Sequence, residues 1–157
     1  MTRPDVERRI TCPAELKHLP ALLQLVDTAC GQLNATPAEQ HDLRLMAEEA
    51  CVNVMRHAYP VDAPGSMTFC FTATGCAPGH LVAMTIEDAG TPFDPLSRAP
   101  PDLAAPAEER GIGGLGILLI RQLADHVAYR HDAARGNIFV IEKALGQLPT
   151  APAAQAH

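Results

Sequence analysis

The sequence lacks the marks of several large protein classes. Its 12 Lys and Arg residues are outnumbered by 18 Asp and Glu residues, and the resulting net charge of −6 provides no basic surface for nucleic acid. None of the five cysteines forms a C-x-x-C pair, and no set of cysteines and histidines has the spacing of a zinc site. An odd number of unpaired cysteines indicates reduced thiols. We therefore expect a cytoplasmic protein that binds no nucleic acid.

The sequence also lacks a segment suited to a membrane. No basic stretch followed by an apolar run opens the chain, as it would in a secretory signal. The longest uncharged stretch lies between Asp62 and Glu87, but a spanning helix needs about 20 continuous apolar residues. This stretch is interrupted at Pro64, Gly65, Gly75, Pro78 and Gly79. Two strands and a turn fit it better, so we expect no membrane association.

What remains is a chain of 157 residues, 47% of them hydrophobic, which is enough for one folded domain. We predict that this domain spans residues 1–145 and that residues 146–157 form a disordered tail. The apolar periodicity and the turn residues predict the order β-α-α-β-β-α-β-β, which is typical of an α+β fold. The segments are RRITCPA, ELKHLPALLQLVDTACGQL, a helix from Thr36 to about Tyr59, SMTFCFTAT, HLVAMTIEDAG, LGILLIRQLAD, HVAYRHD and NIFVIEKA.

The second helix has a clear start and an unusual face. Thr36, Pro37 and Glu39 predict an N-terminal capping box. Further along, Glu49, Asn53 and His57 are each four residues apart, so they share one side of a helix whose other residues read as core. This polar face is compatible with a solvated surface or with a functional site. Glu48 lies about 140° from Asn53 around the axis, and its position four residues after Arg44 favours an exposed ion pair.

Two further motifs have both an ordinary and a functional interpretation. In IEDAGTPFDP, Asp88 and Gly90 end a strand, either as a common Asp-x-Gly turn or as part of a binding site. In GIGGLG, the glycines from Gly111 to Gly116 open a helix, either as a glycine cap or as a phosphate cradle. The same glycines fit the dinucleotide pattern G-x-G-x-x-G, but a proline-rich loop precedes them instead of a strand. The acidic residue expected about 20 positions later falls near the turn at Gly136, which disfavours a dinucleotide-binding oxidoreductase.

Taken together, the motifs resemble the GHKL ATPases, and most closely the bacterial anti-sigma-factor serine/threonine kinases. EEACVNVMRHAY is similar to the N box of that family, DAGTPFDP to its D-x-G-x-x-F-D-P box, and GGLGILLIRQLADHVAYR to its glycine box and the helix after it. RGNIFVIEK resembles the last strand. Many GHKL members have a second glycine two residues after the first, where this chain has Pro92, and this departure favours the anti-sigma-kinase branch.

The resemblance implies a two-layer α/β sandwich with a mixed sheet and with helices on one face. It implies ATP and Mg²⁺ as cofactors, with Glu49 as the catalytic base and Asn53 as the metal ligand. Asp88 would accept a hydrogen bond from the adenine amino group, and Gly90 would allow the base to approach. Gly111, Gly113, Gly114 and Gly116 would wrap the phosphates, and we expect a nucleotide-responsive lid from Leu96 to Gly114. His57 and Arg110 would help to neutralise the phosphate charge. Arg56, His57 and Arg110 are equally compatible with surface or packing roles.

The resemblance further implies a serine/threonine protein kinase of a partner-switching pathway. Its substrate would be a STAS-domain anti-anti-sigma protein, and a sigma factor would be a second partner. The alternative is a non-catalytic ATP-binding regulatory module that binds protein partners, because the acceptor residue lies on another chain. The sequence does not identify the acceptor or the sigma factor, and it leaves open whether the chain forms a homodimer.

Overall fold

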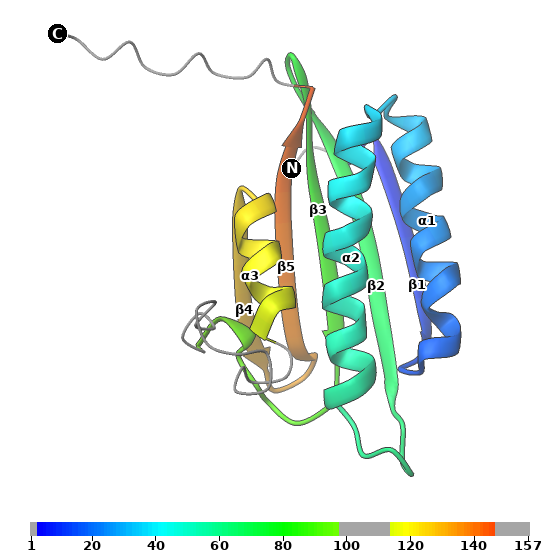
Figure 1. Ribbon diagram of the computed structural model, residues 1–157, viewed down its shortest axis with the longest axis vertical. Helices are drawn as coiled ribbons and strands as arrows, with labels where there is room; N and C mark the ends of the chain where they lie inside the picture. Colours follow the sequence, from blue (N-terminus) through cyan, green and yellow to red (C-terminus); the bar gives the residue numbers. More distant parts are fainter. Residues whose placement is uncertain (1–2, 98–113, 147–157) are drawn as a thin grey trace, which may run out of the picture.

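The computed structural model describes residues 3–97 and 114–146 (Figure 1). The order of its elements matches the predicted order, with two short 3-10 helices in addition. The strands are β1 (Val6–Pro13), β2 (Ser66–Cys76), β3 (Gly79–Asp88), β4 (His126–Asp132) and β5 (Gly136–Leu145). The helices are η1 (Leu16–His18), α1 (Leu19–Gln32), α2 (Pro37–His57), η2 (Pro95–Ser97) and α3 (Gly114–Leu123). The predicted tail lies almost wholly outside the described residues.

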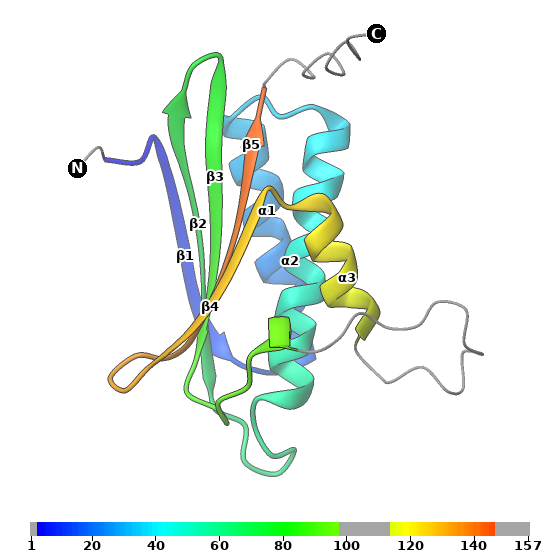
Figure 2. The same ribbon diagram turned by 90° about the vertical axis from the view of Figure 1, so that its left-hand side faces the viewer.

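The strands form one sheet in the order β1-β2-β3-β5-β4, and the three helices lie together on one of its faces (Figure 2). This confirms the α+β, two-layer prediction. The expectation that the sheet is mixed was wrong, because every neighbouring pair of strands is antiparallel. The crossover through α3 does join two strands of the same direction, β3 and β4. They are not neighbours, however, since β5 returns from β4 and inserts between them.

Local sequence explains where the long helix α2 begins. The Thr36 hydroxyl accepts a hydrogen bond from the Glu39 backbone N–H at 3.1 Å, and the Glu39 carboxylate accepts one from the Thr36 N–H at 2.9 Å. This is the predicted capping box, which satisfies two N–H groups that a helix start leaves without partners. The helix ends at His57, two residues before the predicted end and ahead of Pro60.

The core lies between the sheet and the helices. Alternate residues of β2 and β3 are fully buried on the inner face, and they pack against the apolar sides of α1 and α2. The largest of these side chains include Phe69, Phe71, Met84, Ile86, Leu22, Val26, Leu43 and Met46. Because this apolar side of α2 is fixed against the sheet, its polar residues must lie along its flanks. No helix in residues 3–97 and 114–146 is long and apolar enough to cross a membrane.

Candidate functional site

The C-terminal end of α2 is joined to the end of β3. The Thr91 N–H donates to the Ala58 carbonyl at 3.2 Å, and the Tyr59 hydroxyl accepts from the Ala89 N–H and donates to the Ser66 carbonyl, both at 2.7 Å. Burial raises the pKa of Tyr59, and although the Ala89 N–H opposes this effect, the hydroxyl keeps its proton at neutral pH. These bonds fix the strand end that carries Asp88 beside the last turn of α2.

Gly90 is required at this junction by a close approach of two backbones. A Cβ atom added to Gly90 would lie 2.7 Å from the carbonyl carbon of Ala58 and still closer to its oxygen, in a contact that real Cβ atoms do not make. The sequence predicted that Gly90 allows a close approach of the adenine base. In the structure, the backbone that lies close to Gly90 is the Ala58 carbonyl at the C-terminal end of α2.

Asp88 is buried, with 8% of its surface exposed, and among the described residues only one of its two carboxylate oxygens accepts hydrogen bonds. Its Oδ1 atom accepts hydrogen bonds from the Gly90 N–H and from the side-chain amide of Asn137, both at 2.9 Å. Within residues 3–97 and 114–146 no group donates to Oδ2, and that atom is not sealed from solvent. Asp88 therefore presents one oxygen that can accept a hydrogen bond from a ligand.

Asn137 is a site residue that the sequence analysis missed. It lies on β5 directly opposite Asp88 on β3, with only 6% of its surface exposed. Its amide nitrogen lies 3.2 Å from the Gly90 carbonyl oxygen and 3.3 Å from that of Thr91, and its amide oxygen accepts from the Tyr129 hydroxyl at 2.6 Å. The available signal was its place in NIFVIEK, where Asn137 shares an inward face with Phe139 and Ile141 at a period of two.

The polar face of α2 meets the start of α3. Glu49 and Asn53 are half-buried, whereas His57 is exposed. A Cβ atom on Gly116 would lie 3.4 Å from the Glu49 carboxylate carbon and closer still to its Oε2, so this carboxylate occupies the space over the first turn of α3. The structure thus brings Glu49 and Gly116 together, and Gly114 begins the same helix.

The described residues fit a cation that is held mainly by phosphate oxygens. Neither the Glu49 carboxylate nor the Asn53 amide has a hydrogen-bond partner within the described ranges, so both can take a ligand. The described chain contains no group of three or more His, Cys, Asp or Glu side chains that could enclose a metal. Mg²⁺ bound together with a nucleotide needs only one or two protein oxygens, and Asn53 is of the right type.

Glu48 does not form the ion pair that the sequence favoured. Arg44 bonds instead to Asp27 on α1 at 2.5 Å, and Gln40 donates to the same carboxylate at 3.0 Å. The helical spacing of Arg44 and Glu48 was correct, but the neighbouring helix offers a carboxylate on the other side of the arginine. Glu48 is half-buried.

Three of the predicted phosphate-binding residues, Arg110, Gly111 and Gly113, lie outside the described residues, as does most of the predicted lid. Of the glycine motif the structure places only Gly114 and Gly116.

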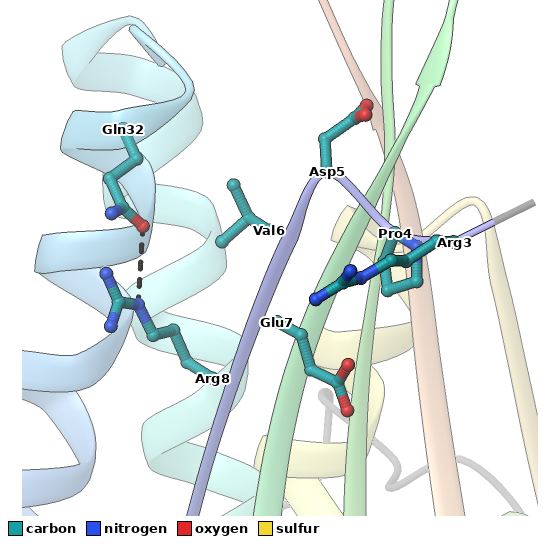
Figure 3. Close-up of a pocket in the computed structure, with 7 residues that line it drawn as sticks. All are labelled: Arg3, Pro4, Asp5, Val6, Glu7, Arg8 and Gln32. Carbon is teal, nitrogen blue, oxygen red and sulfur yellow. Dashed lines mark hydrogen bonds between the residues drawn. The ribbon is translucent and has the colours of Figure 1, made fainter.

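A separate hollow of about 500 Å³ lies at the N-terminal end of β1 (Figure 3). It is lined by Arg3, Pro4, Asp5, Val6, Glu7, Arg8 and Gln32, and Arg8 donates to Gln32 across it at 3.3 Å. Val6 pairs with Ala73, whereas the other end of β1 pairs with Ser66 near the α2 junction. The hollow is therefore at the opposite end of the sheet from Asp88 and is no part of the candidate site.

Comparison with known proteins shows which family this chain is similar to. The model of the histidine kinase-like ATPase domain matches residues 12–143. A serine-protein kinase RsbW from Halalkalibacterium halodurans is 30% identical over 132 residues, which cover 79% of this chain and 75% of the relative. An RsbW from Bacillus cereus is 29% identical over 124 residues, which cover 76% of this chain and 74% of the relative.

A solved structure shares the fold. The crystal structure of the RsbU and RsbW domains of a Mycobacterium tuberculosis protein aligns with 90% of this chain at a TM-score of 0.60 and 16% identity. This chain covers 33% of that longer chain.

Proposed function

Because this chain belongs to the histidine kinase-like ATPase domain family, we propose that it is an ATP-dependent serine/threonine protein kinase of a partner-switching pathway. The observation that carries the proposal is the position of the Glu49 carboxylate, which fills the space that a Cβ atom on Gly116 would need. It puts a carboxylate that has no hydrogen-bond partner among the described residues against the helix start that follows the glycine motif, on the same helical face as Asn53. Transfer of a phosphoryl group needs a positioned nucleotide, neutralised phosphate charge and a carboxylate near the attacking hydroxyl.

In this proposal each residue of the site has one task. The open oxygen of Asp88 accepts a hydrogen bond from the adenine amino group. The amide oxygen of Asn53 is a ligand of Mg²⁺, which supplies charge neutralisation at the phosphates when it is bound. The Glu49 carboxylate takes the proton from the hydroxyl of the protein substrate. His57, Arg110 and the glycines Gly111, Gly113, Gly114 and Gly116 contact the phosphates.

We further propose that the substrate is a STAS-domain anti-anti-sigma protein, phosphorylated on Ser or Thr, and that a sigma factor is the second partner. Support comes from the relatives named serine-protein kinase RsbW. The direct test is to incubate the chain with ATP, Mg²⁺ and a candidate STAS protein and to measure the intact mass of that protein. A gain of one phosphoryl group is the expected result. Binding of ATP and of the partner without any transfer would favour the non-catalytic regulatory module instead.

The role of Glu49 has a matched control in its neighbour. Glu49→Gln should retain ATP binding and lower phosphotransfer by about 10²–10⁴-fold, the usual contribution of a positioned base. Glu48→Gln makes the same chemical change one residue away, about 100° around the helix, and should leave the rate nearly unchanged. If Glu48→Gln were the inactive variant and Glu49→Gln remained active, the assignment of the base would be wrong.

A further inference from the structure

We propose that Asn137 is a positioning residue that sets the preference for adenine, because it fixes which oxygen of Asp88 remains open to a purine base. The inference rests on the proposed function, since it concerns the base of the bound nucleotide. It assigns a role to a buried residue that belongs to none of the three motifs from which the site was predicted.

The orientation of the Asn137 amide is determined by its neighbours. Its nitrogen faces three oxygens, which belong to the Asp88 carboxylate at 2.9 Å, the Gly90 carbonyl at 3.2 Å and the Thr91 carbonyl at 3.3 Å. A carboxylate and two carbonyls can only accept hydrogen bonds, so the NH₂ group must point toward them. The amide oxygen then faces the Tyr129 hydroxyl, which can donate to it at 2.6 Å, and the Nδ1 atom of His131 at 3.3 Å. The reverse orientation would place an oxygen against three acceptors.

The fixed orientation of the Asn137 amide determines which oxygen of Asp88 is left to accept a further hydrogen bond. Oδ1 receives both the Asn137 amide and the Gly90 N–H, while the second oxygen, Oδ2, receives no bond within residues 3–97 and 114–146. Oδ2 is therefore a pure acceptor at a buried carboxylate. It pairs with the 6-amino group of adenine, whereas the 6-oxo group of hypoxanthine or guanine would face it acceptor to acceptor. A site that leaves a buried polar group unpaired rejects the wrong ligand strongly.

Asn137 also holds the loop that follows the strand. By bonding to the carbonyls of Gly90 and Thr91, it ties the turn after β3 to β5. A serine in its place has a single hydroxyl proton, so it cannot serve the carboxylate and the two carbonyls together. Such a variant should hold the Asp88 carboxylate less firmly in its orientation without removing it. The affinity that is lost should be the part that depends on recognition of the base.

The test measures the affinities of ATP and inosine triphosphate by calorimetry with Mg²⁺, using the full chain. The two nucleotides differ at position 6 of the purine, where an amino group is replaced by an oxygen, and in the proton at the neighbouring ring nitrogen. The wild-type chain should prefer ATP. Asn137→Ser should weaken ATP binding by about tenfold and inosine triphosphate binding by much less, so that the preference shrinks. Tyr129→Phe removes one neighbour of the Asn137 oxygen and leaves the His131 ring nitrogen at 3.3 Å, so it should change the preference in the same direction by a smaller factor.

A substitution at Asp88 gives a sharper outcome. In Asp88→Asn, the introduced amide must turn its oxygen toward the Asn137 and Gly90 donors, so its nitrogen faces the base. The preference should then reverse in favour of inosine triphosphate. In the double variant Asp88→Asn with Asn137→Ser the reversal should be weaker, because one of the two orienting donors is reduced.

The matched control is Asn34→Ser, the same chemical change in the turn between α1 and α2, at an exposed position that contacts none of these groups. Its nucleotide preference should equal that of the wild type. Equal losses of both nucleotides in Asn137→Ser, or no loss, would overturn the inference while leaving ATP binding intact. A wild-type chain that bound neither nucleotide would overturn the proposed function as well.

Discussion

Adding a single methyl group at Gly116 should displace the Glu49 carboxylate without removing it. In Gly116→Ala the new Cβ would lie 3.4 Å from the carboxylate carbon and 3.5 Å from the Cβ of Glu49, both ordinary contacts. The Oε2 atom, however, lies well inside the shortest approach that a Cβ atom tolerates. Since Oε2 is the far end of a rotatable side chain, the carboxylate can withdraw by roughly 1 Å to reach normal contact distance.

The variant should therefore separate activity from stability. Replacing glycine by alanine inside a helix raises the free energy of unfolding by up to about 1 kcal/mol, and by less in a first turn such as this one. The melting temperature should stay the same or rise by about 2–4 °C. A displacement of about 1 Å at a reacting group can lower the rate by about 10²-fold. We expect phosphotransfer to the partner to fall by this order, and ATP affinity to fall by a smaller factor, because the proposed phosphate contact of Gly116 is also disturbed.

The assay is the initial rate of phosphorylation of the proposed STAS substrate, with calorimetry for ATP and thermal unfolding for stability. Gly31→Ala is the matched control, because it makes the same replacement in α1 with no atom within 4 Å of the added Cβ. It should gain similar or greater stability and retain the full rate. If Gly116→Ala phosphorylated the partner at the wild-type rate, the position of Glu49 over α3 would not matter for catalysis, and our assignment of the base would fail.

Three further predictions concern stability and thiol reactivity. Burial alone would raise the pKa of Glu39, but hydrogen bonds from the Thr36 and Gly146 N–H groups outweigh it and hold this pKa below its ordinary 4.5. Glu39→Gln should therefore be less stable than the wild type at pH 7 in urea titrations, and the difference should close as the pH falls below 4.5; a difference that is independent of pH would contradict this. Tyr59→Phe leaves the Ala89 N–H and the Ser66 carbonyl without their partner and should cost about 1–3 kcal/mol of unfolding free energy in the same titrations, so an unchanged midpoint would refute the role of that hydroxyl. Iodoacetamide at pH 8 should label only the exposed Cys76 rapidly, since burial raises the pKa of Cys51 to about 12 and that of Cys30 to about 11; two fast adducts by intact mass would be inconsistent with the fold.

The parts of the fold that depend on neighbours in sequence could be predicted. The capping box of Thr36 and Glu39 spans four residues, and the shared face of Glu49 and Asn53 follows from the helical repeat alone. The strands were recognisable because each is bounded by glycine, proline or polar turns. The final hairpin was placed correctly for the same reason, with its turn at Gly136.

The parts that depend on strand order and helix packing could not be predicted in this way. Arg44 has a carboxylate four residues later in its own helix, yet it bonds to Asp27 because α1 packs alongside α2. The mixed sheet was expected from the family resemblance, and although α3 joins two strands of the same direction, these strands are not neighbours. Nothing in the local pattern says that β5 returns to the gap between them.

That insertion of β5 is what completes the end of the sheet that carries the candidate site. With β4 beside β3, the residue opposite Asp88 would come from β4, and Asn137 on β5 would not face it. With β5 in that place, Asn137 faces Asp88 in the buried interior, where the water that could otherwise satisfy the carboxylate is largely excluded. A buried carboxylate needs donors, and only one of its two here, the Gly90 N–H, is local in sequence. The second donor, Asn137, comes from another strand. The sequence alone marked Asp88 as a site residue but could not identify this partner.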